Sequence, residues 1–174
     1  MLEKPMFAFG GRGPLRWLRY RLRQTIHAVQ PEIHDHDADY ATEILGAGEL
    51  ALFHKMEKRD RRHGIEVMGR LHRHGIGDRD LLAAALLHDC GKGEAAVWLR
   101  GLNVVAGPAV RVLGIRDGAG WRGAAYRLAY HAAIGAEFAV RAGSSAATVR
   151  YISGRVGPGE EAKIALLRWA DDIS

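Results

Sequence analysis

The sequence contains a single cysteine, and this scarcity excludes two kinds of structure. Cys90 has no second cysteine with which to form a disulfide within the chain, and one thiolate cannot build a cysteine-based zinc site. A lone thiol is typical of a reducing compartment. The sequence also shows no signal peptide, because Pro5, Gly10 and Gly11 interrupt its N-terminal segment. We therefore expect a cytoplasmic protein.

Long apolar runs and alternating apolar and polar residues are also absent. The most apolar later segment, residues 95–115, is interrupted by Arg100, Pro108 and Arg111, whereas a membrane-spanning helix needs about 20 apolar residues. We expect a buried pair of helical segments there, with partial exposure to lipid as the alternative. No stretch has the period of a β-strand, and no internal repeat or low-complexity tract is present. The sequence therefore predicts an all-α fold, a compact helical bundle without a β-sheet.

The composition is that of an ordinary globular protein with an excess of positive charge. The chain has 174 residues, of which 48% are hydrophobic and 26% charged, and its net charge is +5. This charge favours anionic ligands such as nucleotides. We expect residues 1–47 to form a basic helical extension packed on a core of residues 48–174. The arginines of its helical part, residues 15–29, are interpreted as a solvated face, with a nucleic-acid surface as the alternative.

One stretch combines deep burial with polar chemistry. Residues 81–92 read Leu-Leu-Ala-Ala-Ala-Leu-Leu-His-Asp-Cys-Gly-Lys, and the first seven are apolar on every side, as in a fully buried helix. Asp78 is the expected N-cap and Gly91 the expected C-cap. Burying unpaired imidazole and carboxylate groups costs roughly several kcal/mol. His88 and Asp89 therefore suggest a metal site, with a buried histidine satisfied by a neighbour as the alternative.

A second histidine faces the same core. A helix capped by Asp60 and ending near His74 places His63 in one row with Val67 and Leu71. This spacing predicts that the His63 imidazole points inward.

The last helix supplies a carboxylate. In a helix over residues 160–172, Asp171 shares a face with Ile164 and Leu167, and Asp172 lies about 100° away. Three helices are thus expected to direct four ligand-type side chains inward: His63, His88, Asp89 and Asp171. Two imidazoles and two carboxylates suit one divalent ion such as Mn²⁺, Fe²⁺, Co²⁺, Ni²⁺, Zn²⁺ or Mg²⁺.

This order of residues resembles the HD-domain superfamily of metal-dependent phosphohydrolases. The resemblance covers about residues 48–174 and implies an all-α bundle, a metal held by those four side chains, and hydrolysis of a phosphoester through a metal-activated water. The substrate it implies is a nucleotide or another small phosphorylated metabolite. The segments that carry it are Arg62-His63, Ala-Leu-Leu-His-Asp-Cys-Gly-Lys at 85–92, His131-Ala-Ala-Ile-Gly-Ala-Glu, and Ala170-Asp171-Asp172.

The sequence departs from members that bind two metals. Those members carry a further histidine, often a pair, after the helix corresponding to residues 144–152, where this chain has Ser153-Gly154-Arg155. We therefore expect one metal per chain, and neither a cyclic-dinucleotide phosphodiesterase nor a di-iron oxygenase. His131 then acts as a phosphate-facing or ligand-supporting group, and a structural core histidine is the alternative.

Further roles follow from charge and position. Asp89 is expected to accept a proton as well as to bind the metal. Lys92 is expected to bind the substrate phosphate, with stabilisation of the helix C-terminus as the alternative. Arg62 and Arg155 are candidates for the same phosphate contact, and a solvated glycine-rich loop is the alternative for Arg155.

A second cluster, Ile33-His34-Asp35-His36-Asp37, contains metal-ligand side chains but has no apolar frame to hold them. We interpret it as a solvated loop or helix start.

The leading functional hypothesis is a metal-dependent phosphohydrolase with a small anionic phosphoester as its partner. The alternative is a non-catalytic regulatory or ligand-binding module of the same fold. We expect no membrane span and no nucleic-acid partner, and self-association is left open.

Overall fold

The computed structural model describes residues 35–94, 99, 107, 110–155 and 157–173, with side chains described from Asp39 onward. The chain divides into two compact units, Met1–Gln30 and Pro31–Ser174. The helix expected at residues 15–29 and most of the apolar segment at 95–115 lie outside the described residues.

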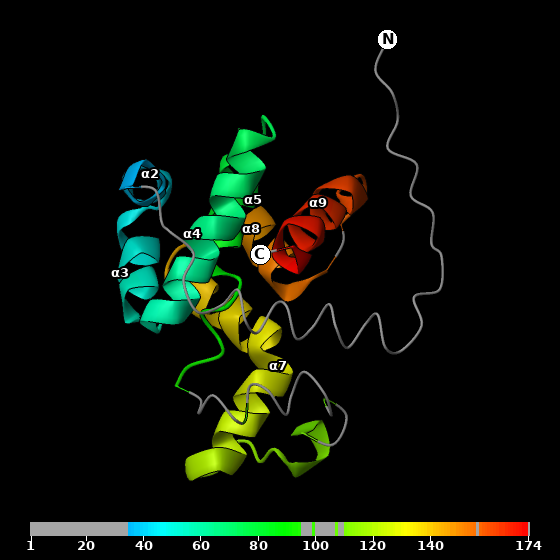
Figure 1. Ribbon diagram of the computed structural model, residues 1–174. Helices are drawn as coiled ribbons and strands as arrows, with labels where there is room; N and C mark the ends of the chain where they lie inside the picture. The colour runs from blue at the N-terminus through cyan, green and yellow to red at the C-terminus, as the bar shows by residue number, and fades with distance from the viewer. Residues whose placement is uncertain (1–34, 95–98, 100–106, 108–109, 156, 174) are drawn as a thin grey trace. The chain divides into compact units, whose positions relative to one another are not determined.

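The described part of the second unit is an all-α bundle, as predicted. It contains no strand, and α4 and α8 both pack against α5. Figure 1 shows α5 and α8 in the middle of the bundle, with α4 on one side and α9 on the other. The helices are α2 (Asp35–Ile44), α3 (Ala47–Lys55), α4 (Lys58–Arg73), α5 (Arg79–Leu87), α7 (Gly120–Arg141), α8 (Ala146–Ser153) and α9 (Glu161–Asp172). No helix of the described residues combines the length and apolarity needed to cross a membrane.

The central helix is buried on every side. All seven residues from Leu81 to Leu87 are at most 1% exposed, because α2, α3, α4, α8 and α9 all pack against α5. Each fully buried leucine stabilises the fold by about 1.5–3 kcal/mol. The apolar run at residues 81–87 therefore anchors the bundle, and the residues that follow it are held in place by its burial.

The N-cap expected at Asp78 is confirmed. Its Oδ1 accepts hydrogen bonds from the backbone N–H groups of Asp80 and Leu81, at 3.0 and 3.1 Å. Its other oxygen, Oδ2, pairs with Lys163 Nζ of α9 at 2.5 Å. One carboxylate therefore starts the central helix and ties it to the last one.

This double role can be separated by substitution. We expect Asp78→Ala to lower the free energy of unfolding by about 1–2 kcal/mol, because both the cap and the ion pair are lost. Asp78→Asn keeps a good capping group and removes only a partly exposed ion pair. This variant should therefore lower the free energy of unfolding by less than about 1 kcal/mol. Urea unfolding of the two variants measures the difference. Equal losses would show that the cap contributes little.

The start of α4 differs from the one expected. The helix begins at Lys58 after the N-cap Glu57, so Asp60 is not the cap but is buried in the first turn. Helix α8 is capped by Ser145, whose side chain accepts a hydrogen bond from Thr148 N. Helix α7 begins at Gly120, after the N-cap Ala119.

The second compact unit begins nearer the N-terminus than the sequence pattern predicts for the core. Helix α2 packs against α4 and α5, and Ala41, Ile44 and Leu45 are buried there. The unit begins at Pro31, whereas the sequence pattern assigns all of residues 1–47 to the extension.

Candidate metal centre

Three helices bring a cluster of possible metal ligands together. His63 lies in the second turn of α4, His88 directly follows α5, and Asp171 lies in the last turn of α9. His63 Nε2 is 2.8 Å from Asp171 Oδ1, and His88 Nε2 is 3.5 Å from the same oxygen. One nitrogen or oxygen from each residue lies within 4.8 Å of the others. These three side chains are therefore close enough to share one ion.

A further contact holds α9 against α4 at this point. Arg70 Nη1 donates a hydrogen bond to Ala170 O at 2.8 Å, while Nη2 donates to Glu66 Oε1 at 3.1 Å. The bond fixes the backbone one residue before Asp171. Arg70 was not expected as a site residue, because nothing in its sequence context indicates which carbonyl it reaches.

The tautomer of His88 is set by its own helix. Its Nδ1 lies 2.8 Å from Ala85 O, so Nδ1 carries a proton and donates to that carbonyl. Nε2 therefore faces the cluster with its lone pair when the ring is neutral. This nitrogen is buried and has no hydrogen-bond partner among the described residues. A buried imidazole nitrogen with its other nitrogen bonded to a carbonyl is the usual arrangement of a metal-binding histidine.

The charges around His88 favour a positive charge at Nε2. Asp89 Oδ1 and Asp171 Oδ1 lie 3.3 and 3.5 Å from it. Burial acts to lower the pKa of His88, but the Asp89 carboxylate, followed by Asp171, raises it to about 9. Burial also opposes the charge of both carboxylates. Nevertheless, His88 and Lys92 hold the pKa of Asp89 well below its usual range. His63 and His88 do the same for the pKa of Asp171. The place between the carboxylates thus favours the protonated form of His88.

Asp89 lies next to this cluster, and Lys92 binds the carboxylate oxygen that faces away from His88. Its side chain is 2% exposed, and Oδ2 forms an ion pair with Lys92 Nζ. Oδ1 faces His88 and lies 4.0 Å from His131 Nε2. Lys92 is thus engaged with Asp89, three residues before it, and its ammonium helps to keep that carboxylate ionised.

Gly91 allows the turn after α5 to touch α7. It was expected as a helix C-cap, but α5 ends at Leu87 and Gly91 does not have the left-handed backbone that such a cap requires. A Cβ atom at Gly91 would lie 2.1 Å from His131 O and 2.6 Å from Gly135 N. The absence of a side chain at this position therefore lets α7 bring His131 to Asp89.

A local break in α7 orients His131. The preceding residue, Tyr130, has non-helical backbone angles (φ −119°, ψ 15°). His131 Nδ1 lies 2.8 Å from Leu128 O, so Nδ1 donates to that carbonyl and Nε2 is the acceptor nitrogen of the neutral ring. Nε2 lies 4.0 Å from Asp89 Oδ1. Burial, with the charge of Lys92, lowers the pKa of His131. At neutral pH the ring is therefore an uncharged proton acceptor at the edge of the cluster.

The remaining candidates are not brought into the cluster. Arg62 is half-buried on α4, and Arg155 is exposed in the loop after α8. No hydrogen bond or ion pair joins either guanidinium to the cluster within the part of the chain that the structure describes. His34 lies outside the described residues, and residues 35–37 form the first turn of α2.

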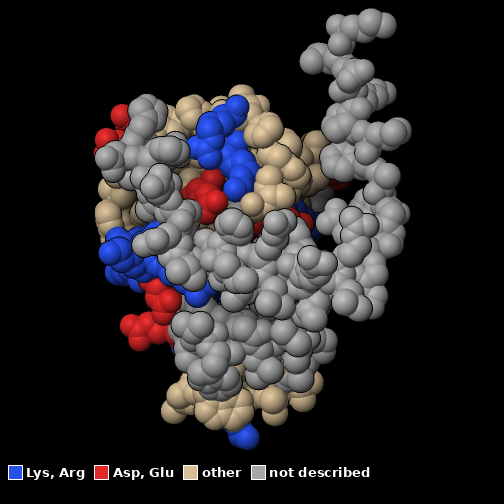
Figure 2. All heavy atoms as spheres, viewed as in Figure 1, with Lys and Arg blue, Asp and Glu red and all other residues tan. Residues whose placement is uncertain are grey.

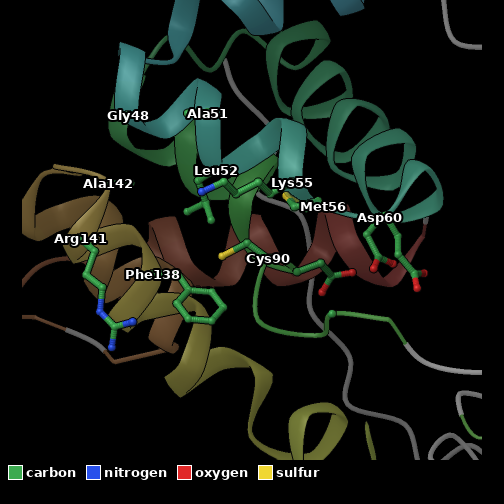
Figure 3. Close-up of a pocket in the computed structure, with 13 residues that line it drawn as sticks. Gly48, Ala51, Leu52, Lys55, Met56, Asp60, Cys90, Phe138, Arg141 and Ala142 are labelled. Carbon is green, nitrogen blue, oxygen red and sulfur yellow. The ribbon is translucent and has the colours of Figure 1, made fainter.

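A cavity of about 540 Å³ lies next to Asp89. The sequence did not indicate this cavity. It is bounded by α3, the start of α4, the turn after α5 and the C-terminal half of α7. Figure 3 shows the Cys90 sulfur between Leu52 and Phe138. Burial, followed by the charge of Asp89, raises the pKa of this thiol to about 12, so Cys90 is an inert wall of the cavity.

Comparison of the chain with protein-family models, with curated proteins and with solved structures gives no match.

Proposed function

We propose that this protein is a metal-dependent phosphohydrolase that cleaves a phosphoester, best suited to a nucleotide or another small phosphorylated metabolite. The observation that carries the proposal is the buried Nε2 of His88, which faces two carboxylates without a hydrogen-bond partner among the described residues. The resemblance of the motifs to the HD-domain superfamily supports the same reaction class.

His63, His88 and Asp171 are the residues suited to hold a divalent ion, with Asp89 beside them. When bound, such an ion supplies Lewis acidity that polarises a phosphoryl oxygen and lowers the pKa of water. The donor set of two imidazoles and two carboxylates fits Mn²⁺, Fe²⁺, Co²⁺, Ni²⁺ or Zn²⁺ better than Mg²⁺, which prefers oxygen ligands.

The chain's own groups account for proton handling. His131 Nε2 is oriented as an acceptor by the bond from its Nδ1 to Leu128 O, and the lowered pKa keeps it uncharged at neutral pH. It can therefore take a proton from an attacking water as a general base. Asp89 stabilises the imidazolium that forms, because its Oδ1 lies 4.0 Å from that nitrogen.

The exposure of the cluster is suited to a substrate that approaches from one side. Asp171 and His131 have side chains that are 45% and 32% exposed, whereas those of His88 and Asp89 are 12% and 2% exposed. A substrate would approach from the side of Asp171 and His131, while the buried His88 and Asp89 hold the site together.

The proposal is tested by metal analysis followed by a phosphatase screen. The purified protein should contain one divalent ion per chain, and should release phosphate from nucleotides or small phosphoesters when loaded with Mn²⁺ or Ni²⁺. A single ion is expected because the described residues form one group with suitable geometry. Two strong binding events per chain in calorimetry would overturn the count. Tight metal binding without turnover across the screen would instead favour the non-catalytic module.

Metal binding should release a proton. His88 has a pKa of about 9 in the metal-free protein, so it is protonated at neutral pH and must lose that proton before Nε2 can bind an ion. We expect about one proton per ion at neutral pH, and a release that falls toward zero as the pH rises above about 9. Calorimetry in buffers of different ionisation enthalpy measures the release. Binding enthalpies that do not depend on the buffer would contradict the expectation.

A further inference from the structure

The turn that precedes α7 gathers exposed apolar side chains. Four of the seven large hydrophobic residues that are exposed in the described chain fall within residues 112–121. They are Val112, which is 84% exposed, and Leu113, Ile115 and Trp121, which are 45%, 46% and 45% exposed. Single exposed apolar residues are ordinary, but a contiguous group marks an interaction surface. We call residues 111–122 the apolar tip.

The apolar tip projects from the bundle and is held in a defined shape. Figure 1 shows the N-terminal half of α7, in yellow-green, extending away from the other labelled helices. Ile115 N donates to Arg122 O at 3.1 Å, which closes the turn. A Cβ atom at Gly114 would lie 2.7 Å from Tyr126 N, so the turn lies directly on α7. Beneath it is a small core of its own, formed by Leu99, Val110, Ala124, Ala125 and Leu128.

The same tip carries a net positive charge. Arg111, Arg116 and Arg122 are all exposed, against a single acidic residue, Asp117. Two of these guanidinium groups lie over exposed rings, Arg122 over Trp121 and Arg111 over Tyr130, each at 5.3 Å from the ring centre. At this extremity of the molecule, the described atoms that Figure 2 shows are mostly tan, with one blue side chain.

From this combination we propose that the apolar tip binds the surface of a membrane rich in anionic lipid. Tryptophan at the level of the headgroups, aliphatic side chains below it and arginines beside phosphates form the pattern of a peripheral membrane site. Contact with anionic headgroups neutralises the three arginines. A symmetric dimer through the same face would instead bring like charges of two copies together, which costs free energy.

Binding of the full chain to lipid vesicles tests the proposal. The protein should sediment with vesicles of phosphatidylcholine mixed with phosphatidylglycerol, and much less with phosphatidylcholine alone. Arg116→Gln should weaken binding about fivefold, which corresponds to about 1 kcal/mol per arginine near an anionic surface. Arg59→Gln, an exposed arginine of α4, is the matched control and should change binding less than twofold, roughly.

The apolar part is tested in the same assay. Trp121→Ser should weaken binding to the mixed vesicles several-fold. Val140→Ser is the control, because Val140 is 61% exposed at the other end of α7. This control should leave vesicle binding nearly unchanged. These substitutions alter exposed side chains, so circular dichroism should show unchanged helix content. Quenching by brominated lipid should be lower for Trp121→Phe than for the parent chain, because the tip tryptophan is the one that enters the bilayer.

Three outcomes would overturn the proposal: no sedimentation with either vesicle, binding that both tip variants leave unchanged, or self-association that Trp121→Ser abolishes. The last result would identify the tip as an interface between copies of this chain. The assay does not involve the metal centre, so its failure is distinguishable from a failure of the phosphohydrolase proposal.

Discussion

His88→Ala is expected to lose the bound metal and phosphatase activity while it keeps its helices. The substitution removes the buried Nε2 that lies 3.3 and 3.5 Å from the carboxylates of Asp89 and Asp171. Removing a group that organises transition-state charge costs about 10²- to 10³-fold in rate or more. Elemental analysis and phosphate release measure the two losses, and circular dichroism measures the helix content.

Some stability should be lost as well. Asp89 remains buried with Lys92 as its close partner, and breaking a buried charge pair costs about 3–5 kcal/mol, of which the retained lysine should recover a part. His88→Gln is a second variant, because its amide can still donate a hydrogen bond and fill the space. His54→Ala, at an exposed position of α3, is the matched control and should retain metal and activity. Full metal content in a folded His88→Ala variant would show that the assignment is wrong.

Gly91→Ala is expected to cause a large loss of stability for the addition of one methyl group. The added Cβ would lie 2.1 Å from His131 O, which is backbone and cannot rotate away. Overpacking of a tight site costs about 1–3 kcal/mol, and a backbone clash should reach the upper end of that range or exceed it. For a domain of this size, 3 kcal/mol corresponds to a fall in Tm of about 6–12 °C.

The same change should separate activity from metal binding. Pushing α7 away displaces His131 from Asp89, whereas His63, His88 and Asp171 lie on elements other than α7. Activity should therefore fall further than metal content does. This readout distinguishes the positioning of His131 from general damage to the fold.

Two other glycines provide a graded comparison for Gly91→Ala. Gly135→Ala meets Cys90 Sγ at 3.1 Å and should cost less, while Gly77→Ala has no atom within 4 Å and should be nearly neutral. Thermal unfolding of the three variants orders them. If Gly91→Ala were as stable as Gly77→Ala, the close approach of the turn to α7 would be wrong.

The sequence by itself determined the all-α class and the central helix. Residues 81–87 are apolar in every direction, so only complete burial among other helices satisfies them, and Asp78 marks the start of this helix because its side chain can cap it. The positions of His63 and Asp171 on α4 and α9 follow from helical spacing, since each shares a row with apolar residues. The structure leaves 45% of the Asp171 side chain exposed, which the spacing did not predict. These inferences depend on interactions within one helix, which the local sequence contains.

Only the tertiary structure decided how the site is completed. His131 reaches Asp89 because Gly91 lets the turn after α5 touch α7 and because α7 is broken at Tyr130, and neither contact has a local signature. The pairing of Lys92 with Asp89 depends, in the same way, on the exact path of the turn. The contact from Arg70 to Ala170 joins residues 100 positions apart. Contacts between distant segments are set by the packing of whole helices, and a pattern of single residues does not determine that packing.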